Sequence, residues 1–94
     1  MAVSFASQVR PPDDVLMSEL DREAVLLKLK SESYFGLDET GTRMWQLLLS
    51  SDSLQSAYDA MLAEFDVDPE TLREHLTELV EQLLAHGLVE IVSS

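Results

Sequence analysis

The 94-residue chain contains no cysteine, three glycines, three prolines and only six lysines and arginines. The absence of cysteine excludes disulfides, thiolate metal sites and a cysteine nucleophile, and it is typical of a reducing compartment. No apolar run approaches the roughly 18 residues that a membrane-spanning helix needs. Residues 1–12 also lack the charged and then apolar pattern of a signal peptide. We therefore expect a cytoplasmic protein that does not enter a membrane.

Basic residues are scarce relative to acidic ones. Eighteen Asp and Glu against six Lys and Arg give a formal net charge of −12. From residue 50 onward, Arg73 is the only Lys or Arg. Such a surface repels the phosphates of nucleic acids and anionic lipids, and it favours neutral or basic partners. The same charge also serves solubility, so it argues against nucleic acid without identifying a partner.

The residues that usually carry out catalysis are few. The chain has no Gly-rich phosphate loop, no HExxH motif and no GxSxG motif. His75 and His86 lie on one predicted helix about 16 Å apart, which is too far to share a metal ion. The acidic run at residues 66–70 contains Pro69 and lacks the glycine and glutamate of a calcium loop. We expect no catalytic residue, no metal site and no cofactor, and hence no enzyme.

The first half of the chain shows strand periodicity. Residues 1–14 are predicted to be a flexible arm that ends near a proline pair, and residues 15–94 to be one domain. Strands are predicted over residues 15–20, 24–30 and 34–37, and the middle one alternates apolar side chains with lysines. Two short polar connections between them predict an antiparallel meander.

The second half has apolar residues at helical spacings of three and four. The clearest helix start is Asp68 as cap with Pro69 at the first position, and Gly87 is the predicted left-handed stop. Residues 88–92 form a terminal extended segment. The predicted class is α+β, with a meander and three helices similar to a winged helix-turn-helix. The three helices are predicted to begin at residue 38 or 40, 53 and 69, and to end near residues 50, 65 and 86.

A transcription factor of this architecture would place the third helix in the major groove of DNA. That helix should then expose Arg, Lys, Asn or Gln to the bases. The charges of this chain contradict that function, because the outward side of the helix carries Glu70, Glu74, Glu78 and Glu81.

The opposite side of the third helix is unusually broad. Its apolar residues span about 140° at 100° per residue, whereas a helix packed on one side of a core needs roughly 100°. One explanation is that the excess is also core, and the other is that one margin lines a groove for a ligand. The residues concerned are Leu72, Leu76, Leu79, Val80, Leu83 and Leu84, flanked by His75 and His86.

One stretch of sequence resembles a known signature. Residues 34–48, YFGLDETGTRMWQLL, resemble the PqqD-like family, the precursor-peptide recognition elements of ribosomally synthesised, post-translationally modified peptides. Residues 65–70, FDVDPE, and 83–89, LLAHGLV, resemble the third helix and the end of the same family. The resemblance covers about residues 15–92.

The family implies a non-catalytic protein that binds the leader segment of a precursor peptide. The leader would add as a strand to the edge of the third strand, beside the third helix, and be presented to a radical-SAM enzyme or a leader peptidase. Backbone hydrogen bonds would then supply affinity, and side-chain pockets selectivity. The alternative is a structural adaptor subunit in a permanent complex, without a peptide groove. The resemblance implies a peptide site formed by Ser33, Tyr34, Phe35, Gly36, Leu37, Leu72, His75, Leu76, Leu79, Val80 and Leu83.

Overall fold

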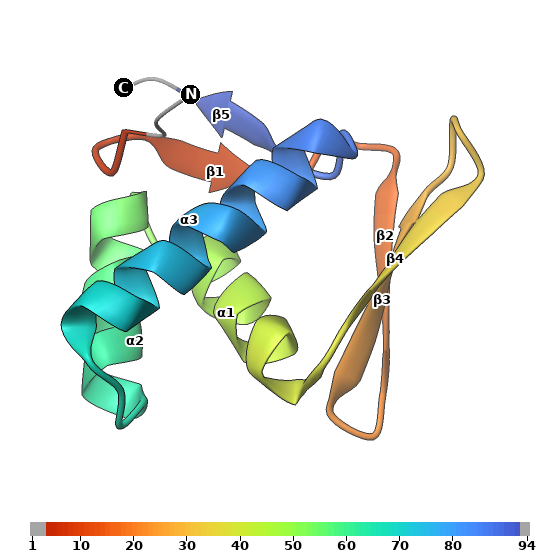
Figure 1. Ribbon diagram of the computed structural model, residues 1–94. Coiled ribbons are helices and arrows are strands. Elements are labelled where there is room, and N and C mark those ends of the chain that lie inside the picture. Colours follow the sequence, from red (N-terminus) through yellow and green to blue (C-terminus); the bar gives the residue numbers. More distant parts are fainter. Residues whose placement is uncertain (1–3, 93–94) are drawn as a thin grey trace.

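The computed structural model describes residues 4–92 (Figure 1). Residues 1–3 of the predicted arm and 93–94 of the predicted domain lie outside the described residues. The α+β class, the three-stranded antiparallel sheet and the three helices are confirmed, whereas the likeness to a winged helix-turn-helix stays a prediction. The elements are β1 (Gln8–Arg10), β2 (Val15–Leu20), β3 (Glu23–Lys28), β4 (Ser33–Leu37), α1 (Glu39–Ser50), α2 (Leu54–Glu64), α3 (Pro69–Ala85) and β5 (Glu90–Val92).

The strands β2, β3 and β4 form an antiparallel sheet in that order. Asp21 and Arg22 connect the first two strands with φ of 53° and 71°, the left-handed values of a type I′ turn. The second connection covers residues 29–32, and β3 therefore ends at Lys28 rather than at residue 30 as predicted. Both turns are tight, so the register between the three strands is fixed at each end.

The three helices α1, α2 and α3 all lie on one side of this sheet, and none of the described residues covers its other side (Figure 1). Each helix begins at the residue type that favours a cap. The Gly41 amide donates to Asp38, and the Thr71 amide donates to Asp68, at 2.7 and 3.2 Å. Asp38 rather than Thr40 therefore caps α1. The largest fully buried side chains are Trp45, Leu26, Leu54, Met61, Leu76, Leu83, Leu88 and Val80.

The segment predicted as a flexible arm contains a strand, which is a correction to the prediction. Its residues 8–10 form β1, which pairs antiparallel with β5, and Val9 opposite Ile91 is buried. The predicted terminal segment 88–92 thereby gains a partner. A strand of three residues is too short to show a periodicity, and this explains why the sequence pattern misses it.

The residues before β1 are also held against the helices. The carbonyl groups of Phe5 and Ser7 accept hydrogen bonds from the first amides of α2, at 2.8 and 2.9 Å. These amides have no partner inside their own helix, so the segment satisfies donors that would otherwise need water. The Phe5 ring meets Tyr58 edge to face, and the Arg73 guanidinium lies 4.0 Å above that ring.

Candidate functional site: the open edge of β4

β4 lies at the edge of the three-stranded sheet, and the direction of its backbone groups follows from the two ends of β3. At one end, a type I′ turn of two residues makes the residues on either side of it, Leu20 and Glu23, a hydrogen-bonded pair between β2 and β3. At the other end the Leu29 amide donates to the Asp14 carbonyl at 2.8 Å. Both contacts face β2. Because the backbone alternates, the odd-numbered residues of β3 face β2 and the even-numbered ones face β4.

The even-numbered residues of β3 lie opposite Ser33, Phe35 and Leu37, which therefore form their hydrogen bonds within the sheet. Tyr34 and Gly36 alternate with these three. They direct their N–H and C=O groups away from β3, toward the open edge. Sequence alone leaves two alternating sets possible, and the register selects Tyr34 and Gly36.

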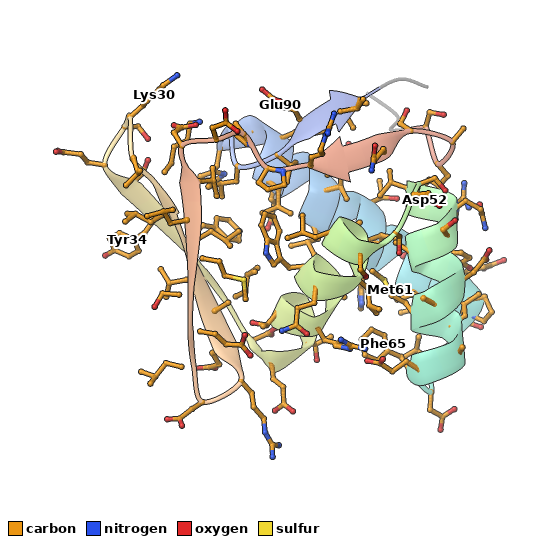
Figure 2. The ribbon with its side chains drawn as sticks, turned by 180° about the vertical axis from the view of Figure 1, so that it is seen from behind. Lys30, Tyr34, Asp52, Met61, Phe65 and Glu90 are labelled. Carbon is orange, nitrogen blue, oxygen red and sulfur yellow. The ribbon has the colours of Figure 1, made fainter. Side chains whose placement is uncertain are left out.

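The side chains of β4 alternate between the two faces of the sheet. Tyr34 projects on the side away from the helices, where it is 76% exposed (Figure 2). Phe35 and Leu37 point to the helix side; Leu37 is buried and Phe35 is half-buried. The Phe35 ring meets the ring of His86 edge to face, with centroids 5.2 Å apart and planes at 69°. This contact brings the C-terminal end of α3 to β4.

The contact between Phe35 and His86 also shows which margin of α3 faces β4. At 100° per residue, His75, Leu79 and Gln82 lie on the same side of the helix as His86. We call these four residues the histidine margin. The opposite margin carries Arg73, whose guanidinium lies over Phe5. The broad apolar face of α3 therefore has one side toward the N-terminal segment and one side toward the open edge.

Most of the predicted α3 residues lie in the core. Leu72, Leu76, Val80 and Leu83 are each 3% exposed or less. They hold α3 in place, and direct contact with a peptide would require the core to open. Leu79 is half-buried and His75 is exposed, so these two can be reached from solvent.

His86 is a residue of this margin that the predicted site omits. The signal for it was present, because a spacing of eleven residues from His75 returns to nearly the same side of a helix. Its Nδ1 lies 2.9 Å from the Gln82 carbonyl oxygen, which anchors the ring at the end of α3. His86 and Phe35 thus define one end of the space between β4 and α3.

A charged junction lies near the same end. The Lys28 ammonium lies 3.2 and 3.3 Å from the two carboxylate oxygens of Asp14. Burial raises the pKa of Asp14. The hydrogen bond and the charge of Lys28, together with nearby backbone amides, lower it by more than burial raises it, so the pKa of Asp14 falls below its ordinary value. The Lys28 stem passes Gly87, where a Cβ would lie 3.0 Å from Cε. Gly87 has φ of 68°, and the predicted left-handed stop is confirmed.

A second ion pair lies away from β4. The Arg43 guanidinium donates two hydrogen bonds of 2.7 Å to the carboxylate of Glu64. The hydrogen bonds of this bidentate contact lower the pKa of Glu64 and raise that of Arg43. Burial acts in the opposite direction on both pKa values, but more weakly than the hydrogen bonds. A cavity of about 400 Å³ beside it is lined by side chains of β2, α1 and α2. The pair joins α1 to α2 and takes no part in the edge.

The open edge of β4 offers groups that can bind another strand. Within residues 4–92, no three His, Cys, Asp or Glu side chains are grouped so that they could hold a metal ion. In the same part of the chain, no helix is long and apolar enough to cross a membrane. The edge itself offers backbone donors and acceptors beside aromatic and apolar side chains, which is the combination that an added strand requires.

Fold and edge together define a small α+β protein whose sheet is open at β4. The family described as coenzyme PQQ synthesis protein D (PqqD) matches residues 23–89. The chain belongs to the PqqD family. A comparison with curated proteins finds no match.

Two solved structures are similar over nearly the whole chain. One is "TbiB1 in Complex with the TbiA(beta) Leader Peptide", with 34% identity and a TM-score of 0.81 over 90% of this chain and 99% of that chain. The other is "Lasso peptide synthetase B1 complexed with the leader peptide", with a TM-score of 0.79 over 88% of this chain and 98% of that one. The second is 23% identical and shows the likeness of fold alone.

Proposed function

We propose that this chain captures the leader segment of a ribosomally made precursor peptide and presents it to a maturation enzyme, without catalysing a reaction itself. The leader adds as a strand to the edge of β4, beside the histidine margin of α3. The observation that carries this proposal is the outward direction of the Tyr34 and Gly36 backbone groups next to the contact between Phe35 and His86. Membership of the PqqD family supports it, as does the likeness to TbiB1, whose structure holds a leader peptide.

The energetics require side-chain contacts as well as strand pairing. Tyr34 and Gly36 each offer one donor and one acceptor, so the edge forms about four hydrogen bonds, worth roughly 2–6 kcal/mol in total. A micromolar complex needs about 8 kcal/mol before the cost of ordering the leader is added. The remainder comes from apolar contacts with Phe35 and Leu79 and with the two histidine rings of the margin.

Presentation to an enzyme is assigned to the uncovered face of the sheet. Five apolar side chains on this outer face are exposed over areas that sum to several hundred Å², on the order of a functional surface patch. The net charge of −12 opposes the stacking of two copies on each other. Together with the side chains that a bound leader adds to it, this face is the docking surface for the maturation enzyme, a radical-SAM enzyme or a leader peptidase, whose own surface is apolar and bordered by neutral or basic residues. The five residues are Leu16, Leu20, Val25, Leu27 and Tyr34.

The same exposed face favours one other candidate, a structural adaptor subunit that is permanently bound to a larger protein. An adaptor needs the apolar face but has no use for an open edge at β4. Leader binding by the isolated chain separates the two functions.

The test is a calorimetric titration with the synthetic leader of the precursor encoded beside this chain. We expect a dissociation constant between roughly tens of nanomolar and a few micromolar. A duplex of random DNA at low salt is the negative control, since the acidic surface repels phosphate. Absence of leader binding at high micromolar concentration contradicts the proposal and favours the adaptor.

A further inference from the structure

Gly36 lies in the interior of β4, where glycine weakens a strand and has to be explained. A Cβ built on it meets no described atom within 4 Å, so no internal contact requires its absence. Among the described glycines it is Gly87, not Gly36, that has a positive φ. Neither packing nor backbone conformation within residues 4–92 accounts for glycine at this position.

The surroundings of Gly36 indicate why glycine is present at this position. Gly36 shares the outer face of the sheet with Val25, which lies directly opposite on β3, and with Tyr34, two residues earlier on β4. Val25 is 42% exposed and Tyr34 is 76% exposed. The third side is the open edge itself, toward which the Gly36 amide and carbonyl point. Gly36, Val25 and Tyr34 thus form a shallow site with a bare backbone floor, which we call the Gly36 niche.

We propose that the Gly36 niche receives a bulky apolar side chain, preferentially an aromatic ring, from the leader residue that pairs directly with Gly36. The inference rests on the proposed function and assigns a specificity determinant to it. Opposed residues on neighbouring strands place their side chains on the same face of the sheet. A ring from the leader can therefore cover the bare glycine and contact Tyr34 and Val25, which is how aromatic residues offset glycine in a sheet.

The niche predicts an unusual pair of effects for Gly36→Ala and Gly36→Val. Because the space is open and both new residues lose less backbone entropy in a strand than glycine does, the melting temperature of the free protein should rise by about 2–5 °C. Leader binding should weaken, by about threefold for alanine and about tenfold or more for valine, because the new side chain occupies the niche. Ser18→Val is the matched control: it adds the same side chain to the same face on the far side of Val25, and affinity should stay unchanged.

The leader supplies the second arm of the test. An alanine scan of the synthetic leader should find one bulky apolar residue whose loss weakens binding to the unmodified chain by about tenfold. Against Gly36→Val, the same leader change should cost at most about threefold, because the contact is already lost.

Full-affinity binding by a stabilised Gly36→Val overturns the niche and leaves the proposed function intact. A fall in melting temperature for both Gly36 variants also overturns it, because glycine then has an internal role. Failure of the unmodified chain to bind any leader contradicts the proposed function itself.

Discussion

The sheet has two edges, and they differ in what surrounds them rather than in their backbones. The backbone groups of Tyr34 and Gly36 on β4 point away from the sheet because successive residues of a strand alternate in direction. By the same alternation, Met17 and Glu19 on β2 point their backbone groups away from β3. Glu19 accepts a 3.4 Å hydrogen bond from the Gln46 side chain on α1, so that edge carries a charged group. The β4 edge instead adjoins aromatic rings and the histidine margin. A charged edge discourages strand addition, and an apolar neighbour favours it.

The sharpest way to break this comparison is to place proline on each edge in turn. Tyr34→Pro removes an outward donor and should weaken leader binding by about 100-fold while the sheet survives, because that amide has no partner inside the sheet. Met17→Pro makes the same change on β2 and should leave affinity within about twofold. Calorimetry measures both, with Tyr34→Ala as the control for the lost ring. Equal losses at the two edges would contradict the assignment of the leader to β4.

Proline at Phe35 should have a different outcome. Its amide bonds to β3, so Phe35→Pro removes a hydrogen bond of the sheet and should lower the melting temperature by about 10 °C or more. Thermal unfolding followed by the fluorescence of the single tryptophan, Trp45, which is buried in the core, measures this loss. A stable Phe35→Pro variant would mean that the amides of Tyr34 and Gly36 bond to β3 and that the Phe35 amide faces the open edge.

The two margins of α3 give a smaller and equally direct comparison. His86→Ala removes the contact with Phe35 and should weaken leader binding by about 5- to 10-fold. Arg73→Ala removes the contact with Phe5 on the opposite margin. It should lower the melting temperature by a few degrees and leave affinity unchanged. If Arg73→Ala weakens leader binding more than His86→Ala does, the leader contacts the Arg73 margin of α3 and not the histidine margin, which contradicts the proposal.

The smallest expected effect is the pH dependence of the ion pair between Asp14 and Lys28, near the end of the β4 edge. The pKa of Asp14 is lowered in the folded chain, so the ion pair with Lys28 stabilises the fold above the unfolded-state pKa of about 3.9. That contribution is lost as the pH falls through the lower folded pKa. Lys28→Met removes the pair, and its deficit in urea midpoint should be largest at pH 7 and shrink below pH of about 4. A deficit that is constant with pH would contradict the role of the pair.

Sequence patterns predicted the parts of this fold that local chemistry decides. Asp68 and Pro69 mark the start of α3, and Gly87 marks its end, because caps and left-handed stops depend on one or two residues. The outward set on β4 could not be predicted in the same way. It depends on the turn at Asp21 and Arg22, which adopts left-handed angles without the usual glycine.

The sequence predicted that the third strand and the third helix, β4 and α3, form the candidate site. It did not predict which residues of α3 can be reached from solvent. A core position and a groove margin are both apolar, so helical periodicity cannot separate Leu76, which is fully buried, from Leu79, which is half-buried. The contact between Phe35 and His86 separates them, because it shows which margin faces the edge.

The most direct test of the leader site is residue-resolved hydrogen exchange with and without the synthetic leader. We expect new protection at the amides of Tyr34 and Gly36. We expect no change at Ser33, Phe35 and Leu37, which are already bonded to β3. The amides of Met17 and Glu19 on the other edge should exchange at the same rate in both samples. New protection at Met17 and Glu19, with none at Tyr34 and Gly36, would place the leader on β2 and contradict the β4 site.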